Sequence, residues 1–147
     1  MNKHLEGVTI MKIKLDEKAH IPTRGHSTDA GLDLYSRETK IIPSRGSAVF
    51  DTGVHIELPH GTTGFLKSKS GLNINHGLTS DGVVDEGYTG SIVVKLYNNS
   101  DVDYQVFKGQ KISQLVILPV VIPEGLEIVQ DLEETDRGNG GFGSTGV

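Results

Sequence analysis

The alternation of apolar and polar residues is the strongest pattern in this chain. The segments 11–15, 54–58 and 92–97 each alternate with a period of two residues. Successive side chains of a strand point to opposite faces, so these three segments predict strands with one buried face. The segment 112–122 is apolar almost throughout, which predicts a strand buried on both faces and interrupted at Pro119.

Clusters of turn-forming residues separate these runs. They stand at positions 43–46, 59–61, 98–101, 108–109 and 123–125. No window keeps a helical period over three turns, and a short helix is expected only after Ser70. Many short strands joined by turns predict an all-β fold, a β-barrel or a jelly roll, and we expect it as one domain in residues 1–130. We expect residues 131–147 to form a flexible, Gly-rich tail.

The amino-acid composition bounds the class of protein. The chain has 147 residues, which suits one domain, but only 35% are hydrophobic. So low a share of hydrophobic residues indicates that part of the apolar surface is buried between subunits. There is no Cys, which excludes disulfides and thiolate metal sites. A net charge of −5 and the lack of a long apolar run lead us to expect neither nucleic acid nor a membrane as partner, and a cytoplasmic location.

The tail has residue types that a plain linker does not need. Five of the ten residues at positions 137–146 are Gly, and among them stand Arg137, Phe142, Ser144 and Thr145. A generic Gly-rich terminus is usually disordered. Here Gly allows backbone N–H groups close to phosphate oxygens, Arg offers a bidentate fork and Phe offers a flat face for a base. The tail therefore predicts a lid that closes over a bound nucleotide.

Two polar segments have the residue types of a phosphate or metal site. Asp29 and Asp33 lie four residues apart among small residues. Taken alone, they favour a turn in which Asp caps backbone N–H groups, and the other interpretation is a carboxylate near Mg²⁺. Lys67 and Lys69 alternate with serines, which suits either a solvated edge strand or a phosphate site.

Two further segments carry single polar side chains at apolar strands. Asp85 follows two β-branched residues, and a partly buried carboxylate at such a strand end can act as a general base on water. Tyr88, three residues on, can stack on a sugar. The alternative for both residues is structural, with Asp85 in a turn and Tyr88 half-buried. Gln114 stands in the most apolar strand and needs a hydrogen-bond partner, which for a lone Gln is more often structural. The six His show no metal-ligand spacing.

Together these segments resemble five ordered motifs of the trimeric dUTPase family. The matching segments are 30–34, 69–72, 82–90, 109–115 and 137–146. Two positions depart from the family pattern: Lys69 stands where Arg is usual, and Leu32 stands where an aromatic residue is frequent. The change at position 69 replaces a bidentate fork with a point charge. Some viral members share this Lys.

The resemblance implies a homotrimer with active sites at subunit interfaces, which hydrolyses dUTP to dUMP and pyrophosphate with Mg²⁺. In the family mechanism, Asp85 deprotonates the water that attacks the α-phosphorus in line, Gln114 helps to hold the water or the α-phosphate, and Asp33 lies near the water shell of Mg²⁺. Substrate binding falls to Lys69, Ser70, Gly71, Thr79, Gly82, Val84, Tyr88, Arg137, Phe142, Gly143, Ser144 and Thr145.

Within that list, the resemblance assigns separate parts of the nucleotide. Lys69 and Ser70 contact the phosphates, and Arg137 clamps the γ-phosphate beside Ser144 and Thr145. Tyr88 packs on the deoxyribose and Phe142 stacks on uracil. The uracil edge is read by the hairpin backbone around positions 79–82.

Two other functions are weighed against this one. A deoxycytidine triphosphate deaminase shares the fold but carries a catalytic Glu seven residues after the position of Tyr88, where this chain has Lys95. A regulatory binding protein on the same scaffold is the second alternative, since some phage and viral dUTPases bind other proteins. A regulatory protein partner therefore stays open, and a viral gene would place the protein in the host-cell cytoplasm or nucleus.

Overall fold

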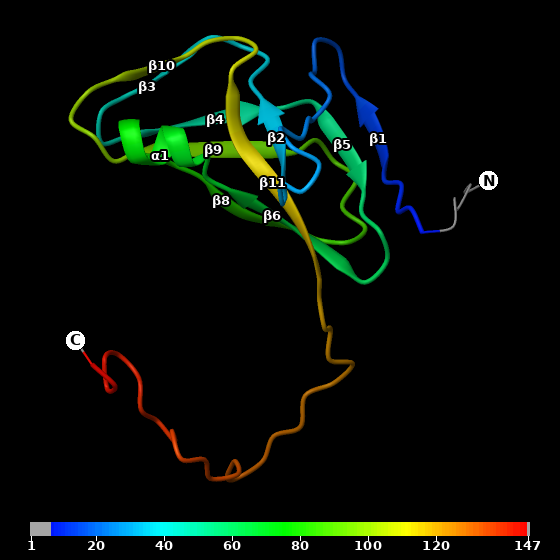
Figure 1. The fold of residues 1–147 in the computed structure, drawn as a ribbon, viewed down its shortest axis with the longest axis vertical. Helices are drawn as coiled ribbons and strands as arrows, with labels where there is room; N and C mark the ends of the chain where they lie inside the picture. Colours follow the sequence, from blue (N-terminus) through cyan, green and yellow to red (C-terminus); the bar gives the residue numbers. More distant parts are fainter. Residues whose placement is uncertain (1–6, 147) are drawn as a thin grey trace.

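The regular elements of this chain are almost all short strands. The computed structural model describes residues 7–146, and Figure 1 shows its course. The elements in this part of the chain are β1 Lys12–Leu15, β2 Gly31–Tyr35, β3 Lys40–Ile42, β4 Ser47–Asp51, β5 Val54–Glu57, β6 Thr62–Lys67, α1 Ser70–His76, β7 Leu78–Thr79, β8 Asp81–Val84, β9 Val93–Asn98, β10 Tyr104–Val106 and β11 Lys111–Pro119.

Antiparallel pairing joins these strands into sheets around one core. The larger sheets have the orders β2-β11-β6-β8 and β4-β9-β7, and β1 pairs with β5 and β10 with β3. Inward side chains of both larger sheets meet in a single apolar cluster. Its fully buried members include Leu34, Ile42, Phe50, Val54, Leu78, Ile92, Val94, Leu96, Val106, Ile112 and Leu115. The predicted all-β class is confirmed.

The two-residue period places the core side chains as expected in the central strands. In β9, Val94 and Leu96 are buried, whereas Val93 and Tyr97 are exposed. The same alternation buries Val54 and Ile56 in β5. The short helix after Ser70 is also confirmed. It ends at Gly77, whose φ of 68° is left-handed and whose N–H donates to the carbonyls of Asn73 and Leu72.

Two apolar segments are more exposed than their patterns predict. Ile13 and Leu15 are 37% and 40% exposed, because within residues 7–146 β1 pairs only with β5 and no second layer covers them. The strand predicted over 112–122 is buried only in its first half. Its pairing with β6 ends at Pro119, and Val121 and Ile122 beyond it are exposed.

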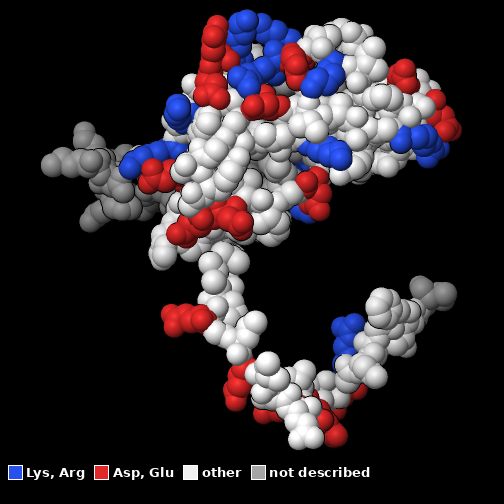
Figure 2. Space-filling view, turned by 180° about the vertical axis from the view of Figure 1, so that it is seen from behind, with Lys and Arg blue, Asp and Glu red and all other residues white. Residues whose placement is uncertain are grey.

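The chain leaves the barrel after β11. The Val120 N–H donates to the Gly61 carbonyl at 3.0 Å, and from there the chain swings away from the sheets (Figure 1). Figure 2 shows the acidic side chains at the start of the tail standing clear of the barrel. In the tail itself, Arg137 Nε donates to the Gly140 carbonyl at 2.9 Å, and Phe142 is fully exposed. Among residues 7–146, no helix is long and apolar enough to cross a membrane.

Candidate active site

Asp33 organises the first group of candidate residues. It lies on β2 beside β11, and only 4% of its surface is exposed. Lys69 Nζ lies 2.5 Å from its Oδ1, and Lys111 Nζ lies 3.1 Å from its Oδ2. We call these three residues the Asp33 cluster. It joins the segment around Asp33 to the Lys–Ser segment and adds a lysine to which no role was assigned.

A β-bulge brings Lys111 to Asp33. Along β2 and β11, Gln114 lies opposite Asp33 and Ser113 opposite Leu34, but Lys111 then lies opposite Tyr35. The extra residue in β11 turns Lys111 to the opposite face from the one that strict alternation would give it. That face is the one on which Asp33 lies. The contact therefore depends on a register that periodicity cannot supply.

The two lysines keep Asp33 ionised. Burial opposes its charge, but hydrogen bonds from Lys69 and Lys111 outweigh burial, so its pKa lies below the ordinary 3.8. In return, the hydrogen bond to Asp33 raises the pKa of Lys111. A carboxylate has about four lone-pair sites, so one ammonium on each oxygen leaves room for a water molecule. Both cations lie partly exposed at the mouth of the cluster.

Gln114 lies against this cluster. Its Nε2 donates to the Ser68 carbonyl at 2.9 Å, which is the partner that its place in an apolar strand required. A Cβ added at Gly31 would lie 2.1 Å from Gln114 Oε1, so only Gly leaves the space that the amide occupies. Ser70 and Gly71 begin α1 directly after Lys69 and are exposed. One region thus contains five positions of the predicted site: Asp33, Lys69, Ser70, Gly71 and Gln114.

Asp85 and Tyr88 form a second group, in the loop after β8. Asp85 is exposed, so this part of the chain does not give it the pocket that its strand-end position predicted. Tyr88 is 48% exposed, and its hydroxyl donates to the Ser91 carbonyl at 2.9 Å. The loop is fastened by Glu86, whose carboxylate accepts the Gly61 N–H at 2.5 Å. This hydrogen bond is the main cause of a lowered pKa for Glu86.

Thr79, Gly82 and Val84, which are expected to contact the base, differ in the groups that a ligand can reach. The Thr79 hydroxyl accepts a hydrogen bond from Asn99 Nδ2 at 3.2 Å. Gly82 packs closely on Leu66, where an added Cβ would lie 3.2 Å from a methyl group. The Val84 side chain is part of the core and only 5% exposed. A ligand can therefore meet Val84 only through its backbone.

The structure does not bring the three groups of candidate residues together in one chain. Lys67 lies opposite Asp81 in the β6–β8 pair, so Lys69 and Asp85 leave this pair at opposite ends. Four strand residues at about 3.3 Å each separate the ends, roughly 13 Å. The tail, to which Arg137 belongs, runs away from the sheets that carry both groups (Figure 1). Within residues 7–146, no three His, Asp or Glu residues form a metal-binding cluster.

Sequence reasoning missed two residues that hold these groups. Lys111 lies in a segment that had been singled out, but nothing in its period placed it beside Asp33. His55 lies between Asp16 and the Thr89 carbonyl, next to the Asp85 loop. Its only sequence signal was a His in the polar phase of an alternating strand, which is also the position of any solvated side chain.

Comparisons with known proteins point to one family. A family model described as dUTPase matches residues 17–146. The deoxyuridine 5'-triphosphate nucleotidohydrolase of Kluyveromyces lactis is 42% identical over 138 residues, which cover 92% of this chain and 93% of that protein. The Arabidopsis thaliana protein of the same name is 47% identical over 135 residues, covering 91% of this chain and 81% of that protein.

Solved structures agree with these relatives. The structure of Staphylococcus bacteriophage 80alpha dUTPase with dUPNHPP is similar to this chain with a TM-score of 0.88 and 32% identity. The similarity covers 95% of this chain and all of that one. A structure of the dUTPase from phage phi11 of S. aureus has a TM-score of 0.78 and 31% identity, covering 86% of this chain.

Proposed function

We propose that this chain, which belongs to the dUTPase family, hydrolyses dUTP to dUMP and pyrophosphate in active sites that three copies of the chain build together. Hydrolysis of dUTP is supported by the relatives, which are named deoxyuridine 5'-triphosphate nucleotidohydrolase. Their similarity covers nearly the whole length of this chain. The shared site rests on the geometry described above, and the metal and the roles of single residues rest on the resemblance to the family.

The separation of the candidate groups is the observation that carries the shared site. A general base and the phosphorus under attack must lie within reach of one water molecule. In one chain, Asp85 and Lys69 lie at opposite ends of the β6–β8 pair, and the tail reaches neither. A closed threefold assembly places different surfaces of neighbouring copies against each other. It can therefore join the Asp85 loop of one copy, the Asp33 cluster of a second and the tail of a third.

The comparison with the phage enzyme supports a role for the tail. Residues 1–130 make up about 88% of the 147 residues, whereas the similarity to the dUPNHPP complex covers 95% of the chain. The similar region therefore includes part of the tail, in the extended course seen in Figure 1. In this proposal Arg137 clamps the γ-phosphate with Ser144 and Thr145 beside it, and Gly143 gives the phosphates close access to backbone N–H groups.

The chemical step uses Asp85 as the base. Its carboxylate removes a proton from a water molecule as the water oxygen forms a bond to the α-phosphorus. The bond from that phosphorus to the bridging oxygen breaks on the opposite side, and pyrophosphate leaves. Lys69 and Ser70 hold the phosphates, and Gln114 helps to hold the water or the α-phosphate. A positioned base of this kind accounts for a factor of roughly 10²–10⁴ in rate.

The residues present fit Mg²⁺ that arrives with the nucleotide. Mg²⁺ keeps several waters and takes one or two carboxylates together with substrate phosphates. The cluster offers one ionised carboxylate with lone pairs to spare for a water, but no cage of protein ligands among the described residues. When bound, Mg²⁺ would neutralise phosphate charge. Asp33 would meet it through a water molecule.

Selectivity for deoxyuridine is assigned to the loop and the tail. Tyr88 packs on the deoxyribose and leaves no space for a 2′-hydroxyl. The backbone around positions 79–82 reads the uracil edge, and Phe142 covers the base. The rigid packing of Gly82 on Leu66 supports this, since a tight hairpin also rejects the thymine methyl group by shape.

The products formed from three nucleotides test this function. With Mg²⁺, the protein is expected to release pyrophosphate from dUTP, little from UTP, and no ammonia from dCTP. Lys95 supports the last expectation, because it points outward over the Tyr97 ring, 5.0 Å from its centroid, and cannot serve as the acid of a deaminase. Ammonia from dCTP, or equal rates with UTP and dUTP, would overturn the proposal.

A further inference from the structure

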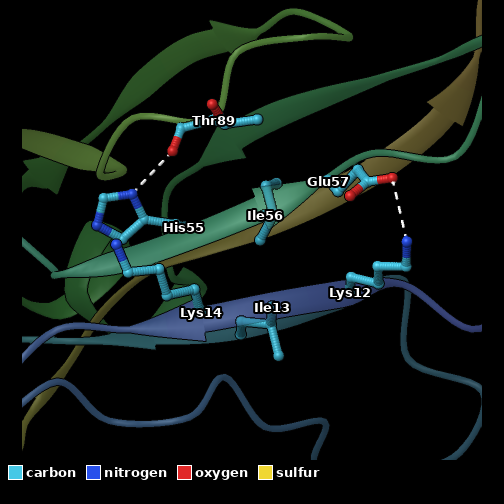
Figure 3. A pocket seen from close by; sticks show the side chains of 7 residues that line it. All are labelled: Lys12, Ile13, Lys14, His55, Ile56, Glu57 and Thr89. Atoms are coloured by element: carbon cyan, nitrogen blue, oxygen red, sulfur yellow. Dashed lines mark hydrogen bonds and ion pairs between the residues drawn. The ribbon is translucent and has the colours of Figure 1, made fainter.

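The imidazole of His55 joins two segments that are distant in sequence. His55 lies on β5, and only 19% of its side chain is exposed. Its Nε2 lies 2.9 Å from Asp16 Oδ2, just after β1, and its Nδ1 lies 2.8 Å from the Thr89 carbonyl (Figure 3). One side chain thus fastens the loop after β8 to the β1–β5 pair.

Both of these partners can only accept hydrogen bonds. A carboxylate and a carbonyl oxygen each need a donor, and neutral imidazole has a single N–H. Both contacts of His55 are therefore made only when both of its nitrogens carry a proton. The hydrogen bond to Asp16 and the one to the Thr89 carbonyl also raise the pKa of His55 above the ordinary 6.5.

The other charges around His55 partly oppose one another. Lys14 lies directly opposite His55 in the β1–β5 register and disfavours its charge, whereas Asp16 favours it. Asp51 is close enough to His55 to interact with the imidazolium charge, and it pairs with Arg37 at 3.2 Å. A hollow of about 320 Å³ opens beside the ring, and its other charged residues, Lys12 and Glu57, pair at 3.7 Å (Figure 3).

The segment that His55 holds is the loop that carries Asp85 and Tyr88. Thr89 directly follows Tyr88. Near Thr89, two further hydrogen bonds of Ser91 hold the C-terminal end of this loop. Ser91 Oγ accepts the Gly53 N–H at 3.0 Å and is hydrogen-bonded to Asp51. At the other side, Glu86 accepts the Gly61 N–H and contacts His60, whose side chain is 98% exposed.

We propose that the His55 imidazolium is a positioning residue that fixes the Asp85–Tyr88 loop, and that loss of its proton releases the loop at Thr89. The assignment of Asp85 as the base rests on the proposed function, but the anchoring itself does not. As pH rises through the raised pKa of His55, one of the two contacts must be lost. The carboxylate of Asp16 competes for the remaining proton, so the Thr89 contact is the one that is released.

Amide hydrogen–deuterium exchange of the loop, measured without nucleotide, tests the anchoring directly. At about pH 6, His55→Gln is expected to exchange the loop amides roughly 2- to 10-fold faster than wild type, the equivalent of one hydrogen bond. At about pH 9, once wild-type His55 has lost its proton, the two proteins should exchange alike. Asp16→Asn keeps the shape but removes the charge, so it should move the wild-type transition to lower pH. His26→Gln, which changes an exposed His away from the loop, serves as the matched control.

The ratio of wild-type to His55→Gln turnover on dUTP is the second readout. It should exceed one at about pH 6 and approach one at about pH 9, following the exchange data. The inference is overturned if the exchange ratio is the same at both pH values, or if Asp16→Asn leaves the transition unmoved. Since exchange needs no substrate, an inactive protein with the expected exchange would contradict the proposed function and leave the anchoring intact.

Discussion

Asp33 shows how one buried carboxylate can prepare the phosphate end of a site. An ammonium is a point charge on a flexible stem, whereas the guanidinium that the family resemblance leads one to expect at Lys69 is a planar fork. Asp33 compensates in part by fixing the directions of both Lys69 and Lys111. In the proposed function, a substrate phosphate would meet ammonium groups that Asp33 has already oriented.

The ionised Asp33 should contribute to stability in a pH-dependent way. Its pKa is lowered in the fold, so its contribution is complete above the ordinary value of 3.8 and is lost as pH falls through the lowered pKa. At neutral pH, Asp33→Asn is expected to lower the free energy of unfolding by about 1.5–3 kcal/mol, the range for hydrogen bonds to a charged group. Urea unfolding at one fixed protein concentration measures this.

The control for Asp33→Asn is Asp101→Asn, which breaks an exposed ion pair with Arg45 and should change stability little. The difference between wild type and Asp33→Asn should shrink as pH falls below about 4. If Asp33→Asn lowers the free energy of unfolding equally at low pH, the loss comes from the changed shape of the side chain and not from its charge.

At the scale of elements, the sequence predicted what depends on local period and missed what depends on register. The two-residue alternation predicts the strands β5 and β9. The helix after Ser70 was expected where that alternation stops. The contact of Lys111 with Asp33 depends on a bulge in β11, and that of His55 with Thr89 on how a loop returns to the β1–β5 pair. Such pairings join segments far apart in the chain, and periodicity carries no information on them.

The tail is the element whose state should depend on ligand. Ordering costs roughly 1–2 kcal/mol of backbone entropy per residue, and covering Phe142 returns only about 1.5–3 kcal/mol. Trypsin should therefore cut after Arg137 readily in the free protein and slowly with a non-hydrolysable dUTP analogue and Mg²⁺. Deleting residues 137–147 should leave folding and trimer formation intact but greatly reduce turnover. Equal cleavage with and without nucleotide would contradict the lid.

At the scale of the whole molecule, the chain has apolar surface that it does not cover itself. Exposed apolar side chains lie on the outer face of the β4–β9 pair, at the end of β11 and just beyond it. They include Val49, Val93, Tyr97, Leu118, Val121 and Ile122. Exposed apolar side chains on neighbouring strands are candidates for an interface between copies of the chain. It agrees with the low hydrophobic content and with candidate site residues that remain apart in a single chain.

The central claim is that each active site takes its base and its tail from different copies of the chain. Mixing two inactive variants tests it most directly: Asp85→Asn, which keeps the tail, and a chain ending at Asp136, which keeps the base. After subunit exchange in equal amounts, random assembly should give an intact base and tail in about a quarter of the sites, with activity recovered accordingly. Light scattering should show mixed assemblies near three times 15.8 kDa. If verified mixed trimers stay inactive, base and tail act within one chain and the shared site is wrong.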